Sequence, residues 1–392
     1  MTQGYREIGR AVAKHAKELT TLSLEIHANP ELGFQEKAAC AAQTAVLRRA
    51  GFTIETPFAG VRTAYKAVRG KGAPVFCFTA EYDALPEIGH ACGHNLIAAC
   101  SVGAGIALAA ALERARVRGT VVVMGTPAEE SQGGKVVMIR KGALRGVDAA
   151  MMAHPQSRTM ADPGCAAITR YQVTYFGRAA HAAASPHKGK NALDAIMLLF
   201  HAVNAWRQHL PESSRIHGIV TDGGAAANIV PERAQCVYFL RSPDDRILAD
   251  MVKRFRNIAR GAALMTDTRV SISSSTIPYK ATWPNQALNA AYVDEARAVG
   301  LDPEANPKPN RASTDFGDVS HAVPGSHVYF GITEADIPGH SVAFREAAAT
   351  PFAQKQMLRT AEALARVGWR FFTDAAFRKD VAKRFRERKG QR

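Results

Sequence analysis

The chain has 392 residues, which is too long for one ordinary hydrophobic core and predicts two domains. Hydrophobic residues make up 47% of it, a fraction typical of globular proteins, and the formal net charge is +15. Part of this excess lies after Phe377, where eight Lys and Arg residues face only Asp380 and Glu387. We interpret this stretch as a solvated tail, so charge alone does not favour a nucleic-acid-binding protein.

The sequence also indicates a compartment. We expect no membrane span, because we find no uninterrupted apolar run near the roughly 18–20 residues that a span needs. Residues 1–7 are polar and lack the apolar core of a secretory signal. The cysteines are scattered without paired spacing, which argues against a disulfide framework. We therefore expect a cytoplasmic protein.

Helices and strands alternate over the first 155 residues. Apolar residues at helical spacing predict helices, and short apolar runs bounded by Gly or Pro predict buried strands. The expected elements are helices at about 5–28, 35–50, 95–114 and 134–141, and strands at about 61–68, 74–79, 120–127 and 149–153. This order favours an α/β fold with a doubly wound, mostly parallel sheet.

The pattern changes near residue 166. The expected elements that follow are a strand at 168–176, a helix at 191–208, strands at 216–221 and 235–240, a helix at 244–265 and a strand at 268–273. Strand–helix–strand–strand–helix–strand is the order of a split βαβ α+β unit. Helices at 285–299 and 351–371 return to the α/β pattern. We predict one domain of residues 1–165 and 278–392, interrupted by an inserted domain of residues 166–277.

Polar side chains follow three successive predicted strands. Residues 80–95, Ala-Glu-Tyr-Asp-Ala-Leu-Pro-Glu-Ile-Gly-His-Ala-Cys-Gly-His-Asn, follow the first of them. Glu129 and Glu130 follow the next strand, and His154 follows the third. Because the carboxyl ends of parallel strands meet at one edge of a sheet, we expect these groups to lie close together.

These residue types suit a metal-dependent hydrolase. Cys92 and His94, with only a glycine between them, can bind one ion. If Glu129 and Glu130 are extended, they point to opposite sides, so one can bind metal while the other faces a water molecule. Divalent ions activate water and polarise a carbonyl, which is what amide hydrolysis at neutral pH requires.

Eight segments carry a resemblance to a known family. The chain resembles the aminoacylase/carboxypeptidase-G/ArgE–DapE family of dinuclear metallopeptidases. Within that family it is similar to the amidohydrolase branch that acts on aminobenzoyl-glutamate, indole-acetyl-amino acids, N-acyl amino acids and β-alanyl dipeptides. The matching segments are residues 27–34, 81–96, 125–130, 152–155, 177–195, 227–231, 313–320 and 340–341.

The resemblance implies the roles of the first domain's residues. Glu129 would be the general base, and Asp83 would orient a metal ligand. One or two divalent ions are expected, zinc or manganese, with cobalt and nickel as alternatives. The implied metal ligands are Cys92, as a thiolate bridge between two ions, His94, Glu130, His154 and His340.

The resemblance also implies roles for the inserted domain, as a dimerisation or lid domain. His181 would reach the active site of the partner subunit in a homodimer and help to stabilise the tetrahedral intermediate. Asn228 and Arg241 would hold the carbonyl and the carboxylate of the substrate. The substrate would be a small molecule with a free carboxylate.

Two positions depart from the family pattern. Asn95 stands where many relatives have Asp, and Glu81 stands where other branches have His or Asp. Either change can alter the occupancy of a second metal.

The predicted function is metal-dependent hydrolysis of the amide bond in a small N-acyl or N-aroyl amino acid or dipeptide. The alternative on the same fold is a hydrolytic deaminase of an aromatic amine. Two other classes remain open, namely a non-catalytic metal-binding or peptide-binding protein, and a nucleic-acid binder that rests on charge alone.

Overall fold

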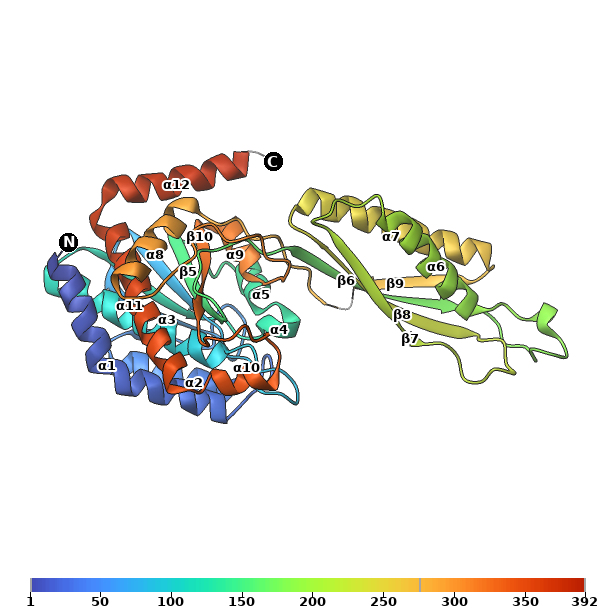
Figure 1. The fold of residues 1–392 in the computed structure, drawn as a ribbon, viewed down its shortest axis with the longest axis horizontal. Helices are drawn as coiled ribbons and strands as arrows, with labels where there is room; N and C mark the ends of the chain where they lie inside the picture. The colour runs from blue at the N-terminus through green and yellow to red at the C-terminus, as the bar shows by residue number, and fades with distance from the viewer. Residues whose placement is uncertain (1, 275, 391–392) are drawn as a thin grey trace. The chain divides into compact units, whose positions relative to one another are not determined.

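A computed structural model describes residues 2–274 and 276–390, and Figure 1 shows its fold. The chain forms two compact units. The first comprises Met1–Gly164, Thr282–Asn310 and Asp315–Arg392, and the second comprises Cys165–Ala281 and Arg311–Thr314. The second unit thus interrupts the first along the sequence.

A mostly parallel sheet forms the centre of the first unit. Its strands are β1 (Thr53–Glu55), β2 (Tyr65–Lys71), β3 (Val75–Ala80), β4 (Gly119–Gly125), β5 (Ala149–Gln156) and β10 (Gly325–Gly331). Among the described residues they form a six-stranded sheet in the order β1-β2-β4-β3-β5-β10. The strands β4, β3, β5 and β10 run parallel, and β1 and β2 form an antiparallel edge.

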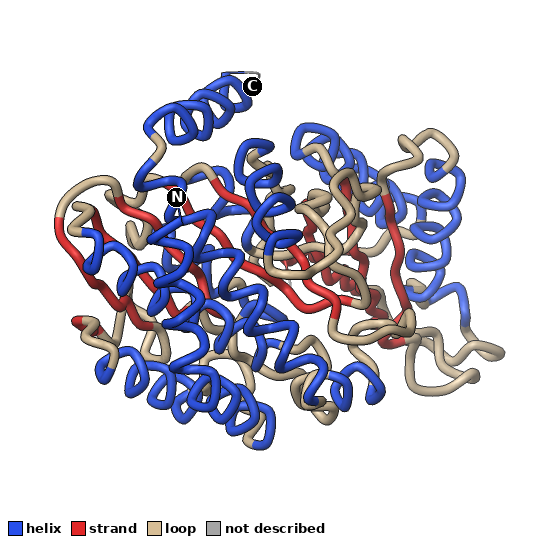
Figure 2. Tube along the Cα trace, turned by 60° about the vertical axis from the view of Figure 1, so that its left-hand side comes forward, coloured by secondary structure: helices blue, strands red, loops and turns tan. Residues whose placement is uncertain are grey.

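Helices cover both faces of this sheet. They are α1 (Thr2–Ala28), α2 (Lys37–Arg49), α3 (His94–Ala115), α4 (Glu129–Gln132), α5 (Gly134–Arg140), α8 (Gln286–Ala298), α9 (Phe316–Ala322), α10 (Val342–Ala347), α11 (Pro351–Thr373) and α12 (Ala375–Gly390). Figure 2 shows the strands of this unit with helices beside them.

Alternation along β3 explains the two layers. Phe76 and Phe78 belong to a large core that includes residues of α1, α3 and α11. Cys77, between them, belongs to a separate core with Met138 of α5 and Phe316 of α9. Successive residues of a strand point to opposite faces, so both faces of the sheet are buried.

The central helix α3 is long and apolar enough to cross a membrane, by length and composition. The sequence analysis expected no such stretch, because Asn, Ser and Gly residues interrupt the apolar run. In the structure, 94% of the apolar window of α3 is buried inside the fold. A buried core helix passes the same test, so α3 gives only weak evidence for a membrane span.

The second unit is a smaller α+β fold. Its elements are β6 (Ala167–Phe176), the short 3₁₀ helix Pro186–Lys188, α6 (Ala192–Arg207), β7 (Arg215–Asp222), β8 (Arg233–Ser242), α7 (Asp245–Met265) and β9 (Arg269–Ser274). The sheet is antiparallel, in the order β7-β8-β6-β9. Tyr238 of β8 shares a core with Leu199 of α6 and Phe255 of α7, so the helices cover one face. The predicted fold class, a mostly parallel α/β sheet with an inserted α+β unit, is confirmed.

Some elements differ from the expectation. The strand expected at 61–68 is β2, which begins at Tyr65, because residues before it form turns. The basic tail forms the helix α12, in which the ion pairs Lys383–Glu387 and Arg384–Asp380 join successive turns.

Candidate metal centre

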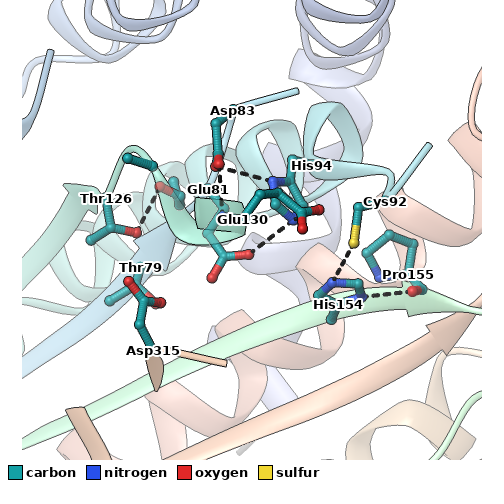
Figure 3. Close-up of polar contacts among 12 residues, drawn as sticks. Thr79, Glu81, Asp83, Cys92, His94, Thr126, Glu130, His154, Pro155 and Asp315 are labelled. Carbon is teal, nitrogen blue, oxygen red and sulfur yellow. Dashed lines mark hydrogen bonds and ion pairs between the residues drawn. The ribbon is translucent and has the colours of Figure 1, made fainter. Parts of the chain in front are cut away.

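The five predicted metal ligands all belong to the first unit. Two of them lie where β3 leads into α3, one lies in α4 after β4, one lies near the end of β5, and one precedes α10. They are Cys92, His94, Glu130, His154 and His340. Figure 3 shows the first four of these side chains gathered above the strands.

Gly93 lets the loop before α3 approach β5 closely. Its φ is 75°, and a Cβ atom there would stand 2.5 Å from Pro155 Cγ. This close approach leaves Cys92 Sγ 3.4 Å from His154 Nε2. His154 Nδ1 lies 2.7 Å from the carbonyl oxygen of Pro155, which can only accept a hydrogen bond. His154 therefore carries its proton on Nδ1, and the lone pair of Nε2 faces Cys92.

Asp83 orients His94. Its Oδ1 lies 3.1 Å from His94 Nδ1, and its Oδ2 accepts the backbone N–H of Glu130 at 3.0 Å. Burial would raise the pKa of Asp83, but the charge and hydrogen bond of His94 hold it below its ordinary value. Asp83 is thus a carboxylate, and His94 Nε2 faces away from it. This geometry agrees with the orienting role that the resemblance implies.

His94 Nε2 has acidic neighbours but no hydrogen bond. It lies 3.5 Å from Glu81 Oε2 and 3.7 Å from Glu130 Oε1. It is buried, and no residue in the described part of the chain forms a hydrogen bond with it. Such spacing is expected of neighbouring ligands of one ion, because each would bind that ion at about 2.0–2.2 Å.

The tandem glutamates do not divide their roles in the way predicted. They begin the short helix α4 rather than lying extended, so the argument from strand alternation is wrong. Ala128 before them has a φ of 61°, and its N–H donates to Glu36 Oε1 at 2.8 Å. The left-handed Ala128 turns the chain, and the buried Glu36 fixes the turn.

Electrostatics nevertheless separates the two glutamates. Burial raises the pKa of Glu129 well above its ordinary value, and the nearby charges of Glu81, Glu130 and Asp315 add to this effect. Burial also acts on Glu130, but its contact with His340, 3.4 Å from Nε2 to Oε1, lowers the pKa of Glu130. One carboxyl is suited to carry a proton, and its neighbour is suited to remain an anion.

The donor atoms fit one or two metal ions. Ligand atoms of Cys92, His94 and His154 lie within 4.8 Å of one another, and so do those of Cys92, Glu130 and His340. Cys92 belongs to both groups, which supports its predicted bridging position. Burial raises the pKa of its thiol well above the ordinary value, and the charge of Glu130 adds to this.

Lys135 is a central residue that the sequence analysis missed. It is 1% exposed, and its Nζ lies 2.5 Å from Glu81 Oε1 and 2.6 Å from Asp315 Oδ1. Its backbone N–H also donates to Asp315 Oδ2 at 2.9 Å. Burial would lower the pKa of Lys135, but Asp315 and Glu81 raise it, so the ammonium stays charged. A lysine in the apolar sequence Gly-Lys-Val-Val-Met-Ile, soon after two glutamates, was the available signal.

The three predicted site residues of the inserted domain lie in the second unit. His181 and Asn228 are neighbours, since the N–H of Ala182 donates to the carbonyl oxygen of Asn228 at 2.9 Å. His181 Nδ1 accepts the backbone N–H groups of Ala183 and Ala184 at 3.2 and 3.1 Å. Nε2 therefore carries the proton of the exposed His181 ring and is available as a donor. The roles of these residues stay predictions.

Comparisons with known proteins identify the family. Residues 77–365 match Peptidase family M20/M25/M40. The chain belongs to this family. It is therefore a hydrolase of carbon–nitrogen bonds, and the predicted resemblance is confirmed.

Two relatives illustrate the range of the family. The chain is 37% identical to Xaa-Arg dipeptidase of Mus musculus, over 97% of this chain and 92% of that protein. It is 35% identical to a p-aminobenzoyl-glutamate hydrolase protein of Escherichia coli, over 69% of this chain and 60% of that protein.

Solved structures share the fold at low sequence identity. A putative aminohydrolase from methicillin-resistant Staphylococcus aureus superposes with a TM-score of 0.78 at 19% identity, over 94% of this chain and 100% of that chain. The Bacillus subtilis YXEP protein, described as a dinuclear metal-binding peptidase, gives 0.70 at 20% identity, over 91% and 99% of the two chains.

Replacing Lys135 tests the buried ion pairs. Lys135→Met is expected to lower the free energy of unfolding of the metal-free protein by about 3–5 kcal/mol, because it leaves buried carboxylates without a counterion. The triple variant Lys135→Met/Glu81→Gln/Asp315→Asn should recover most of this loss. Urea unfolding measures both, and the control Lys141→Met removes an exposed lysine just after the same helix. Equal stability of Lys135→Met and Lys141→Met would contradict the assignment.

The pH dependence of metal affinity tests Cys92. Because its pKa is raised, the metal-free protein holds the thiol proton at neutral pH, and binding must release it. Zinc affinity should therefore rise with pH between 6 and 8, by about tenfold per pH unit for each proton released. Competition with a chromophoric chelator measures the slope. Cys92→Ser should reduce it by the share of one proton, and an unchanged slope would argue against a ligand role for the thiol.

Proposed function

We propose that this protein is a metal-dependent hydrolase that cleaves the amide bond of a small N-acyl or N-aroyl amino acid or dipeptide with a free carboxylate. The observation that carries the proposal is the convergence of thiol, imidazole and carboxylate donors beside Glu129 at one edge of the sheet. The relatives named above act, by their names, on a dipeptide and on an aroyl amino acid. Both of these substrates contain an amide bond next to a carboxylate.

Four groups would hold the metal around the shared thiolate of Cys92. A thiolate with several imidazoles suits zinc, and the carboxylate of Glu130 also accommodates manganese, so we propose one of these two. A bound divalent ion lowers the pKa of water toward about 7 and polarises a carbonyl. The remaining proposed ligands are His94, His154 and His340.

Glu129 would move the proton. Its raised pKa lets the carboxyl accept a proton from the attacking water and then release it to the leaving amine near neutral pH. Asp83 keeps Nδ1 of His94 protonated and so keeps the ring in one orientation. His181 would donate a hydrogen bond from Nε2 to the developing oxyanion.

We also propose that the protein acts as a cytoplasmic homodimer. All six cysteines are free, which agrees with a reducing compartment and with a metal-binding thiolate. In the dimer, His181 of one protomer would complete the active site of its partner.

Glu129→Gln separates proton transfer from metal binding. The variant should bind metal like the wild type but hydrolyse N-benzoyl-glycine about 100-fold to 10,000-fold more slowly, because the amide cannot accept the proton. Glu130→Gln is the matched control and should lose metal instead. Metal analysis and release of free glycine are the two measurements. Near wild-type turnover by Glu129→Gln would show that another group is the base.

The same assay distinguishes amide hydrolysis from deamination. Amide hydrolysis releases the free amino acid, whereas a deaminase would release ammonia from an aromatic amine such as aniline or aminobenzoate. Ammonia release without amino acid release would replace the proposed reaction with the alternative.

Mixing two inactive variants tests the contribution of His181 to its partner. His181→Ala and Glu129→Gln homodimers are each expected to be inactive. Refolding or subunit exchange of an equal mixture should restore about one quarter of the activity, since half of the dimers are mixed and each has one intact site. No recovery, with mixed dimers demonstrated by mass spectrometry, would exclude completion of the site by the partner.

A further inference from the structure

The sheet of the second unit has one open face. Along β8, Tyr238 and Leu240 are buried under α6 and α7, whereas Phe239 and Arg241 between them are partly exposed on the other side. The register places Arg170 of β6 opposite Phe239. Arg170 and Arg241 are thus diagonal neighbours on the open face, roughly 7–8 Å apart at Cα in such a pair.

Neither of these arginines has an acidic partner among the described residues. Arg241 donates to the hydroxyl of Ser313 at 3.2 Å. Arg170 lies over the ring of Phe239, with Cζ 5.1 Å from the centroid, and its Nε is buried without a hydrogen bond from any described residue. Two neighbouring guanidinium groups therefore keep most of their donors available.

Other arginines of this sheet have their donors occupied. Arg215 lies opposite Arg241 in β7, but its guanidinium donates to the carbonyl oxygens of Glu212 and Ser214. Arg233, at the far end of β8, pairs with Asp222. The lack of a counterion is specific to Arg170 and Arg241.

The surroundings of the pair carry positive charge. Desolvation lowers the pKa of Arg241, and the charge of Arg170 adds to this. Desolvation likewise lowers the pKa of His217, which lies opposite Phe239, and Arg241 and Arg207 contribute. Each group is affected by cations, so an anion bound here would relieve their repulsion.

We propose that Arg170 and Arg241 form a two-carboxylate binding site, which selects substrates whose leaving amino acid is acidic. Arg241 binds the α-carboxylate that all N-acyl amino acids share, and Arg170 binds the side-chain carboxylate of aspartate or glutamate. A guanidinium group can bind a carboxylate through two hydrogen bonds, so two arginines suit a dicarboxylate. This inference rests on the proposed amide hydrolysis and names its substrate class.

The same charges disfavour a basic leaving amino acid. A lysine or arginine side chain would bring a third cation beside two unneutralised ones, and like charges in a partly buried site repel. The inference therefore distinguishes two relatives: it favours a glutamate conjugate, as in the name of the E. coli relative, over an Xaa-Arg dipeptide, as in the name of the mouse relative.

A matched substrate series tests the inference on the metal-loaded full chain. N-benzoyl-glutamate, N-benzoyl-glycine and N-benzoyl-lysine differ only in the side chain of the leaving amino acid. The wild type should give the highest kcat/KM for the glutamate conjugate and the lowest for the lysine conjugate. Arg170→Gln should lower kcat/KM for the glutamate conjugate by about 10-fold to 100-fold, the effect of losing a charge-assisted hydrogen bond. It should change the glycine conjugate by less than about threefold.

Three variants complete the test. Arg170→Lys keeps the charge and should retain part of the preference, whereas Arg241→Gln should weaken all three substrates. Arg233→Gln removes an arginine from the same sheet that is already paired, and it should leave the preference unchanged. Thermal unfolding establishes that each variant is folded.

Calorimetric binding of free glutamate and free glycine gives a readout independent of turnover. Glutamate should bind more tightly than glycine, and Arg170→Gln should abolish the difference. Equal losses on all substrates in Arg170→Gln, or a wild-type preference for glycine or lysine conjugates, would overturn the inference but leave amide hydrolysis intact. Failure to hydrolyse any conjugate would overturn the proposed function, and the binding of glutamate would then decide the anion site alone.

Discussion

The candidate metal centre depends on the ion pairs of Lys135. Glu81, Asp83, Glu129 and Asp315 are each less than a tenth exposed, and buried carboxyl groups without a counterion tend to hold their protons. The Lys135 ammonium keeps Glu81 and Asp315 in place, and through them it joins the end of β3 to α5 and the residue that precedes α9. One buried cation thus balances the charge of the site and connects the loops that form it.

Left-handed backbone conformations next to the proposed metal ligands are the second constraint. Gly93, Ala128 and His340 have φ values of 75°, 61° and 60°. Only glycine adopts this region freely, so the other two must be held by their contacts. Glu36 accepts the N–H of Ala128, and the carbonyl oxygen of Ala91 accepts the N–H of His340. The ligands are positioned by backbone turns that buried acceptors stabilise.

The sequence could predict the fold class and the convergence of ligands, because strand ends and ligand types are local patterns. It could not predict the cluster around Lys135, since Lys135 and Asp315 lie 180 residues apart and a lysine usually indicates a surface. The error over the extended glutamates has a similar origin. Nothing local indicates that Ala128 adopts a left-handed conformation, which depends on Glu36, 92 residues earlier in the chain.

The two units differ in how they tolerate change. The ligands of the first unit depend on buried contacts among several loops, so a substitution there disturbs folding, charge and chemistry together. Arg170 and Arg241 stand on the open face of a sheet whose other face alone is packed by α6 and α7. Their side chains can be exchanged without altering that core. Selectivity for the leaving amino acid can therefore vary within the family while the metal chemistry and the fold are retained.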